Sequence, residues 1–431
     1  MNKLNQLLQE LCPDGVEYKK LGEVATISRG GSFQKKDYVE SGVPCIHYGQ
    51  IYVHYDLFVD KTISFISEET AKKQKFAEPN DVIMAVTSEN LDDVCKCIAW
   101  LGSEKVAVSG HTAIIHHTLN PKYLVYYLRS SMFYAQKTKL AHGTKVIEVK
   151  PASLEDIVLP VPPTEIQREI VRILDKFTTL SAELSAELSA RQKQYSYYRE
   201  KLLTFKNEIH SLPLRCVVKH SCSGGTPAKG NSEYYQNGTI PWIRTQDVRF
   251  NEIHSVESYI TEKAVRETSA KWIPENCVIV AISGASAGRC AINKIRATTN
   301  QHCLNMEIDP EKALYRYVYH CVCTKYQELL AKKQGARGDL NSTLILDTEI
   351  PVPSLPVQQR IVNVLDNFDA ICSDLQIGLP AEIEARQKQY EYYRDLLLTF
   401  DDADSIISRQ TDRQTDRQTD RQTDRQTDRQ A

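Results

Sequence analysis

The stretch ARQKQYSYYREKLLTF, residues 190–205, returns at residues 385–400 as ARQKQYEYYRDLLLTF. The two copies are identical at thirteen of sixteen positions and begin 195 residues apart. Further back along the chain, LPVPPTEIQREIVRILDKF at 159–177 corresponds to IPVPSLPVQQRIVNVLDNF at 350–368. Proline keeps the chain extended before a helix and is tolerated in the first helical turn. Each copy is therefore predicted to be a proline-led junction followed by a long helix.

Apolar residues recur along both copies at steps of three and four. This seam runs from Ile166 to Phe205 in the first copy and from Val357 to Phe400 in the second. A seam of this length, with polar residues elsewhere, is stable only against another helix. We expect the two copies to pack on each other as an antiparallel pair, and the alternative is two independent surface helices. The seam and spacer positions of interest are Leu184, Leu188, Tyr195, Tyr198, Tyr390 and Tyr393.

The copies differ in length by one four-residue block. The first contains a tandem SAEL repeat, Ser181–Leu188. The second is four residues longer in this region and contains Gly378 and Pro380, which predict a break or kink near Gly378. Because four residues add about 6 Å of helix, one SAEL unit is a length element that can be added or removed without interrupting the helix.

About 150 residues precede each long helix, and these two stretches match weakly. RGGSFQKKDYVESGVPCIHY at 29–48 parallels SGGTPAKGNSEYYQNGTIPWIRTQDV at 223–248, with a double glycine, lysines and a Pro-x-Ile strand in each. DVIMAV at 81–86 parallels CVIVAI at 277–282, and both have the composition of short buried strands. We therefore expect an α+β fold, in which two pseudo-symmetric mixed α/β domains are separated by the two long antiparallel helices. Strand order does not follow from these patterns.

The two ends of the chain flank the repeated domains and helices. The N-terminal helix at residues 2–11 is expected to pack near the end of the last helix. The chain ends in five RQTD units, Arg409–Asp428, in which arginine and aspartate nearly cancel, so this tail is predicted to be disordered. The predicted organisation therefore has five parts, which are the N-terminal helix with the first globular domain (1–158), the central spacer helix (159–206), the second globular domain (207–349), the C-terminal spacer helix (350–400) and the tail (401–431).

The composition of the chain limits the classes of protein to which it can belong. With 431 residues, 42% of them hydrophobic and 25% charged, the chain is long enough for two or three globular domains. No apolar run is long enough to cross a bilayer, and MNKLNQLLQELC at the N-terminus lacks a secretory core, so a cytoplasmic protein is expected. The net charge of −2 requires that any nucleic-acid surface concentrate positive charge locally or borrow it from partner chains.

The twelve cysteines do not follow a metal-binding pattern. Cys95–Cys97 and Cys321–Cys323 are C-x-C pairs in apolar stretches, and no C-x2-C pair has a matching partner pair. We expect reduced, mostly buried thiols, no metal and no cofactor. A phosphate-binding loop, an N-P-P-Y or D-P-P-Y tetrapeptide, GxSxG and HExxH are all missing, and no catalytic residue is assigned.

Over residues 1–400 the sequence resembles the specificity (S) subunit of a type I restriction–modification enzyme. The resemblance rests on LCPDGVEYKKLGEV at 11–24, the VPP and VPS junctions, the SAEL tandem and the two RQKQY-x-YYR helices. It implies two target recognition domains, each reading half of a bipartite site in double-stranded DNA, and helices that set the gap and dock methyltransferase subunits. It also implies a non-catalytic chain that assembles with two methyltransferase (M) subunits and two ATP-driven restriction (R) subunits.

Candidate DNA-binding residues are loop positions with basic or hydrogen-bonding side chains, and glycines that would permit close approach of the backbone. Arg244 and Arg289 are the stronger candidates for guanine or phosphate contact, since both follow strand-like runs into turns. The first half contributes Gly31, Ser32, Lys35, Lys36, His111 and Lys145, and the second contributes Gly225, Thr226, Lys229, Arg244, Gln246, Arg289 and Arg337.

Two other functions compete with DNA recognition. A two-headed protein–protein adaptor is compatible with the near-neutral charge. A stand-alone DNA enzyme is disfavoured by the missing catalytic motifs. For the tyrosine clusters Tyr197–Arg199 and Tyr392–Arg394, position in the helix seam favours packing or subunit docking over stacking on nucleic acid.

Overall fold

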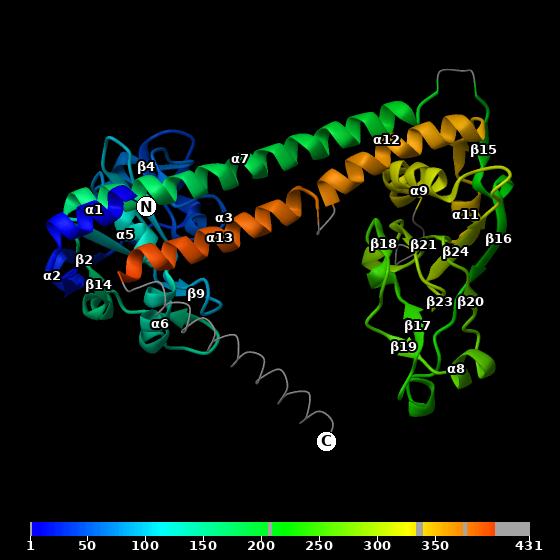
Figure 1. Ribbon diagram of the computed structural model, residues 1–431, viewed down its shortest axis with the longest axis horizontal. Helices are drawn as coiled ribbons and strands as arrows, with labels where there is room; N and C mark the ends of the chain where they lie inside the picture. Colours follow the sequence, from blue (N-terminus) through cyan, green and yellow to red (C-terminus); the bar gives the residue numbers. More distant parts are fainter. Residues whose placement is uncertain (1, 206–208, 333–338, 374–376, 401–431) are drawn as a thin grey trace. The chain divides into compact units, whose positions relative to one another are not determined.

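The chain forms two compact units in the computed structural model, which describes residues 2–205, 209–332, 339–373 and 377–400 (Figure 1). Unit 1 comprises residues 1–183 and 383–431, and unit 2 comprises residues 184–382. Each unit thus holds one globular domain together with part of both helix copies. The RQTD tail lies outside the described residues, and the five-part division stays a prediction.

Unit 1 contains a five-stranded sheet in the order β2-β12-β8-β10-β5. Its neighbouring strands are antiparallel except β10 and β5, which are parallel. The predicted strand at 81–86 is the central strand β8, which is fully buried because both faces of the sheet are covered. The bounds are β2 Ala25–Arg29, β12 Thr112–His117, β8 Val82–Ala85, β10 Cys97–Trp100 and β5 Phe58–Val59.

A second five-stranded sheet in unit 1 has the order β3-β6-β4-β11-β7, with β4 and β11 parallel. Successive side chains of a strand point to opposite faces, so the side chains of β8 pack in two different cores. Ile83 lies in a cluster with Ile46 of β4 and Val108 of β11, between the two sheets. Val82 belongs to the core under the helices. The bounds are β3 Tyr38–Val39, β6 Ser64–Ile66, β4 Val43–Ile46, β11 Val106–Val108 and β7 Lys75–Ala77.

Unit 2 repeats the strand order of both sheets, with one strand fewer in the second sheet. Its sheets run β16-β24-β21-β22-β18 and β19-β17-β23-β20, and the pairs β18–β22 and β17–β23 are parallel as in unit 1. Among the described residues, β3 and the two-stranded sheet of β9, Thr87–Ser88, and β13, Ile147–Glu148, have no counterpart in unit 2. The bounds are β16 Val218–Ser223, β24 Cys303–Ile308, β21 Val278–Ala281, β22 Cys290–Asn293, β18 Asn251–Ile253, β19 Tyr259–Ile260, β17 Ile240–Ile243, β23 Ala297–Thr299 and β20 Trp272–Ile273.

The first helix copy is one helix, and the second is two. The helix α7, Thr164–Leu202, continues through both SAEL units, whereas α12 ends at Ser373 and α13 begins at Leu379. The predicted break near Gly378 is therefore confirmed. The bounds are α12 Leu355–Ser373 and α13 Leu379–Thr399. No helix of the described segments has both the length and the apolar character that a bilayer-spanning helix needs.

The two copies pack on each other within each unit. In unit 1 the ring of Phe177 stacks on Tyr393, with centroids 5.3 Å apart. In unit 2 the rings of Tyr195 and Tyr198 both stack on Phe368, at 5.8 Å. In both units the beginning of one copy meets the end of the other, as in an antiparallel pair. The alternative of two independent surface helices is therefore wrong.

A glutamine ties the start of each copy to its globular domain. Gln167 accepts a hydrogen bond from the backbone N–H of Asn120 at 2.8 Å and donates to the Pro162 carbonyl at 2.8 Å. Gln358 makes the same two bonds, to Leu314 at 2.9 Å and Pro353 at 2.8 Å. Buried amides need such partners, which explains why glutamine occupies this position in both junctions.

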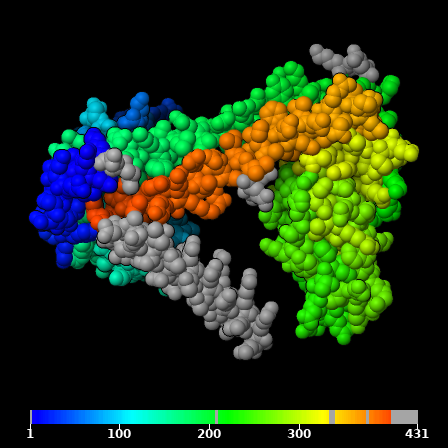
Figure 2. All heavy atoms as spheres, viewed as in Figure 1, coloured from blue at the N-terminus to red at the C-terminus, as the bar shows by residue number. Residues whose placement is uncertain are grey.

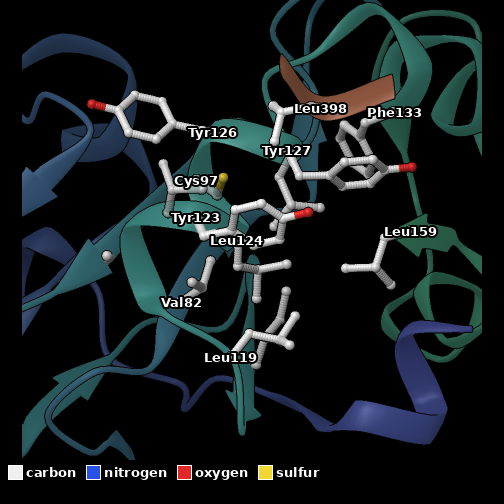
Figure 3. Packing of buried hydrophobic residues seen from close by; sticks show 14 of the residues in the cluster. Val82, Cys97, Leu119, Tyr123, Leu124, Tyr126, Tyr127, Phe133, Leu159 and Leu398 are labelled. Carbon is white, nitrogen blue, oxygen red and sulfur yellow. The ribbon is translucent and has the colours of Figure 1, made fainter. Parts of the chain in front are cut away.

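The core of unit 1 draws on residues far apart in the sequence. Tyr127 of α5, Pro121–Tyr127, lies beside Leu398 of α13, and Tyr123 of the same helix belongs to the same core (Figure 3). The helix α1, Asn2–Leu11, adds Leu4 to this core, and the hydroxyl of Tyr18 donates to the Thr399 carbonyl at 2.6 Å. Figure 2 shows the blue N-terminal segment next to the red-orange end of α13. The predicted packing of the N-terminal helix near the end of the last helix is confirmed.

Candidate DNA-recognition clefts

Loops at the ends of three strands enclose a cleft in unit 1, of about 590 Å³, which we name cleft 1. The loops follow β2, β4 and β11, so the two sheets together hold them in place. The lining residues are Arg29, Gly31, Ser32, Phe33, Gln34, Lys35, His47, Tyr48, Ser109, Gly110 and His111.

An aromatic row forms one wall of cleft 1. The ring of Tyr48 lies 4.5 Å from that of His47 and 5.0 Å from that of His111, measured between centroids. His47 follows β4 and is 8% exposed, and its Nδ1 accepts the Gly49 N–H at 3.2 Å. Burial, with Lys35 and His111 nearby, lowers the pKa of His47. The lowered pKa favours the neutral ring, and the bond that Nδ1 accepts from Gly49 leaves Nε2 as the donor nitrogen.

The glycines of the double-glycine loops are required by close packing within the protein. A Cβ on Gly31 would lie 2.2 Å from Oε1 of Gln74, which accepts the Ser32 N–H at 2.7 Å. A Cβ on Gly225 would lie 2.4 Å from Oγ of Ser269. The structure thus accounts for both glycines without DNA, and their close approach to DNA stays a prediction.

Unit 2 has an equivalent cleft of about 920 Å³, which we name cleft 2. Trp242 forms its wall, donating from Nε1 to the Gly225 carbonyl at 3.1 Å and meeting Tyr235 edge to face. Arg244 follows β17 and is half-buried. The lining residues are Thr226, Lys229, Ser232, Tyr235, Gln236, Trp242, Arg244, Ser258, Tyr259, Asn300 and His302.

The two clefts occupy the same place in the repeated topology. His47 follows β4 as Arg244 follows β17. The backbone N–H of each bonds to a side chain three residues on, at 2.8 Å, namely Gln50 in unit 1 and Asp247 in unit 2. His111 and His302 both lie in the turn that leads into the next strand of the first sheet.

Positive charge is concentrated in both clefts. Arg29 and Lys35 line cleft 1, and Lys229 and Arg244 line cleft 2. The described residues that line the clefts include no aspartate or glutamate. A chain with a net charge of −2 therefore presents two local surfaces suited to a polyanion.

The clefts gather some of the sequence-predicted residues and leave others out. Cleft 1 brings together Gly31, Ser32, Lys35 and His111, and cleft 2 brings together Thr226, Lys229 and Arg244. The predicted residues outside the two linings are Lys36, Lys145, Gly225, Gln246 and Arg289, and Arg337 lies outside the described residues.

Lys145 nevertheless belongs to a segment joined to the edge of cleft 1. Arg29 lines the cleft, donates from Nε to the Gly110 carbonyl at 3.0 Å and pairs with Glu148 at 3.6 Å. Glu148 lies in β13, Ile147–Glu148, directly after the exposed loop that carries Lys145.

Several cleft residues were missed by the sequence reasoning. They include His47, Tyr48, Trp242, Asn300 and His302. The alignment of PCIH with PWIR, at the end of the two Pro-x-Ile strands, was the signal for the first of them, because it places His47 opposite Arg244. Trp242 is only 7% exposed and still lines cleft 2.

A separate cluster in unit 2 has the composition of a metal site but is occupied by an arginine. His320, Asp366 and Asp369 bring ligand atoms within 4.8 Å of one another. Arg316, however, approaches both carboxylate oxygens of Asp366 at 2.7 Å, and Nε2 of His320 lies 3.1 Å from one of them. Despite burial, these two partners lower the pKa of Asp366. The cluster is an ion-pair network that joins α9, Tyr315–Thr324, to α12.

The cysteines and helix positions have structural roles. All twelve cysteines are free thiols, and Cys216 is the exposed one.

The spacer-helix positions differ in burial. Leu184 and Leu188 are half-buried, and Tyr195 and Tyr390 are buried. Tyr198 and Tyr393 take part in the stacks on Phe368 and Phe177. Docking of other subunits on these positions stays a prediction.

Comparison with known proteins identifies the family. The model of the type I restriction modification DNA specificity domain matches residues 13–191 and 218–385, one stretch for each half of the repeat. The chain therefore belongs to this family.

Curated relatives agree with this assignment. The chain is 44% identical over 260 residues to the specificity subunit of the type I restriction enzyme EcoR124I/EcoR124II of Escherichia coli, covering 58% of this chain and 64% of that protein. It is 30% identical over 315 residues to a putative type I restriction enzyme specificity subunit, S.HindORF215P, of Haemophilus influenzae, covering 69% of this chain and 77% of the relative. The match to the first relative thus spans slightly less than two thirds of its length.

Solved structures share the fold at low sequence identity. The S subunit of a type I restriction-modification system from M. genitalium is 14% identical with a TM-score of 0.52, covering 89% of this chain and 96% of that one. A chain from a structure on complex assembly and conformational transition of the type I R-M system is 16% identical with a TM-score of 0.58, covering 89% and 98%. At these identities the likeness concerns the fold alone.

Proposed function

We propose that the chain is the DNA-reading subunit of a type I restriction–modification complex, and that clefts 1 and 2 each read one half of a bipartite site. The observation that carries the proposal is the repetition of a cationic, carboxylate-free cleft at the same place in two units of the same topology. Two such surfaces suit a target made of two separate pieces.

The chemistry of the linings fits a division of labour within each cleft. Exposed lysines such as Lys35 and Lys229 are placed to contact phosphates and fix the register. Hydrogen-bonding groups deeper in the clefts, such as Arg244, are placed to contact base edges. The chain itself performs no catalysis in this proposal, and two methyltransferase (M) subunits and two restriction (R) subunits supply adenine methylation and cleavage.

The helices set the gap between the half-sites. Each SAEL unit of α7 contributes about 6 Å of helix, close to two base pairs of DNA at about 3.4 Å each. Removing or adding one unit should therefore change the unread gap while both half-site sequences are kept.

The test is co-expression with the adenine methyltransferase (M) subunit of its complex, followed by sequencing of methylated motifs in the host genome. We expect a split motif with a fixed gap. Deletion of residues 185–188, one SAEL unit, should shorten the gap and leave both half-motifs unchanged. A change in the half-motifs with an unchanged gap would refute the assigned roles, and the absence of a split motif from the wild-type complex would refute the function.

A further inference from the structure

Arg244 lies in cleft 2 with an unsatisfied hydrogen-bond donor. Its Nε is buried and has no hydrogen-bond acceptor among the residues that the structure describes. A buried donor without a partner is unfavourable for the fold. Because Nε itself is shielded from solvent, a ligand in cleft 2 would meet the terminal nitrogens Nη1 and Nη2 of Arg244.

The surroundings of Arg244 fix where the guanidinium can reach. Its backbone N–H is held by Asp247, and Asn300 and His302 line the same cleft. The rigid wall of Trp242 is anchored through Nε1 to the Gly225 carbonyl. With no carboxylate among the described lining residues, the cleft offers no competing ion pair for the guanidinium.

We infer that Arg244 is a specificity-determining residue of unit 2 and contacts O6 and N7 of a guanine through the major groove. The inference rests on the proposed function. Guanine presents two acceptors that match the two-pronged guanidinium, and this is the commonest specific contact between arginine and DNA. Lys229, which is exposed where Arg244 is half-buried, has the position expected of a phosphate contact instead.

The equivalent position of unit 1 cannot make this contact. His47 stands there, and the Gly49 N–H already occupies its Nδ1 at 3.2 Å. Only one donor, Nε2–H, remains available, so a two-pronged contact with guanine is excluded. The half-site read by unit 1 must therefore be specified by other groups, and loss of Arg244 should alter one half-site only.

The experiment uses the full chain assembled with its methyltransferase subunits and duplexes that carry the methylated motif found for the wild type. Each guanine of the two half-sites is replaced in turn by 7-deazaguanine, which lacks the N7 acceptor. We expect one guanine, in one half-site, at which this replacement weakens wild-type binding about tenfold or more. Arg244→Gln should bind the duplex with guanine and the duplex with 7-deazaguanine at that position equally. It should also relax the methylation motif at that base pair.

Two further variants serve as controls. Arg244→Lys keeps the charge but loses the fork, and its sensitivity to 7-deazaguanine should be smaller than that of the wild type. Arg266→Gln removes an exposed arginine of α8, Glu262–Glu267, outside cleft 2, and it should behave as the wild type.

Three results would overturn the inference. The first is a wild type whose binding is insensitive to every N7 replacement. The second is a sensitivity to 7-deazaguanine that survives in Arg244→Gln. The third is that Arg244→Gln weakens binding equally on all DNA sequences and lowers the salt dependence of binding. The last result would mark a phosphate contact. A wild-type complex that yields no split motif would instead refute the proposed function, so the two failures are distinguishable.

Discussion

Phe177 and Tyr393 stack with their ring planes 25° apart, and they join the beginning of one helix copy to the end of the other within unit 1. The repeat places Phe368 and Tyr198 in the same relation in unit 2, with planes at 22°. The four residues occupy equivalent positions of the duplicated sequence. A stack that recurs in both units indicates that pairing of the two copies is a built feature of each unit.

Tyr393→Ala should therefore destabilise unit 1. We expect a loss of about 1–3 kcal/mol, from the aromatic contact and the apolar surface that it covers. Hydrogen exchange should rise in α13 and α5 and stay unchanged in the sheets of unit 2. Tyr197→Ala is the matched control, because this tyrosine is 59% exposed, and it should change stability by less than about 0.5 kcal/mol. Equal effects of the two variants would argue against the stack as a source of stability.

The comparison of Tyr18 with Ser211 yields a second prediction. Tyr18 pairs with Pro160 and Ser211 pairs with Pro351, so the two residues are equivalent. In unit 2, Ser211 lines a pocket of about 420 Å³ at this place. The phenol of Tyr18, whose hydroxyl reaches the Thr399 carbonyl, thus has no counterpart at position 211.

Ser211→Tyr should fill this pocket and raise the stability of unit 2 by roughly 1 kcal/mol, because we expect its hydroxyl to donate to the carbonyl of Thr204, the equivalent of Thr399. Tyr18→Phe should cost unit 1 about 1 kcal/mol through loss of one hydrogen bond. Differential scanning calorimetry of both variants measures the two shifts, and Leu212→Tyr, at a 39% exposed position, is the control. A lower melting temperature for Ser211→Tyr would show that the pocket does not correspond to the place of the Tyr18 ring.

Much of the fold follows from the sequence because its signals are local. Helical spacing predicted α7, Gly378 and Pro380 predicted the break between α12 and α13, and apolar runs predicted β8 and β21. Strand order did not follow, because pairs such as β4–β11 and β10–β5 join segments that are distant in the sequence and depend on tertiary packing. The equivalence between the sheets of unit 1 and those of unit 2 became visible only from the pairing of their strands.

The clefts were partly predictable for a related reason. Lys35 and Arg244 could be named because charged residues beside a double glycine or after a strand are conspicuous. His47 and Trp242 are largely buried, and the sequence cannot distinguish a buried aromatic of the core from one in a cleft wall. Arg289 follows a strand into a turn, as predicted, but that turn lies outside cleft 2.

The third prediction concerns α1. Leu4 is 4% exposed in the core that also contains Leu397 and Leu398, so Leu4→Ala should cost about 2–3 kcal/mol. The loss should appear in urea unfolding of unit 1, and Gln6→Ala at an exposed position of the same helix should leave the midpoint unchanged. Deletion of residues 2–11 without loss of stability would show that α1 is dispensable for the core.

The fourth prediction is a pH dependence centred on Glu169. This glutamate is 4% exposed, it accepts hydrogen bonds from Arg172, and it pairs with Lys3 of α1 at 3.4 Å. The bonds from Arg172, with the charges of both cations, lower the pKa of Glu169 from 4.5 to about 2. A carboxylate with a lowered pKa stabilises the fold above its unfolded pKa, and this contribution is lost as the pH falls through the folded pKa.

The stability advantage of the wild type over Glu169→Gln should therefore be constant above about pH 5 and decline between about pH 4.5 and pH 2. Urea unfolding of both proteins across this range measures the difference. Glu165→Gln changes an exposed glutamate in the first turn of α7, and its difference from the wild type should be small throughout. An advantage that persists unchanged down to pH 2 would mean that Glu169 stabilises unit 1 through packing and not through its charge.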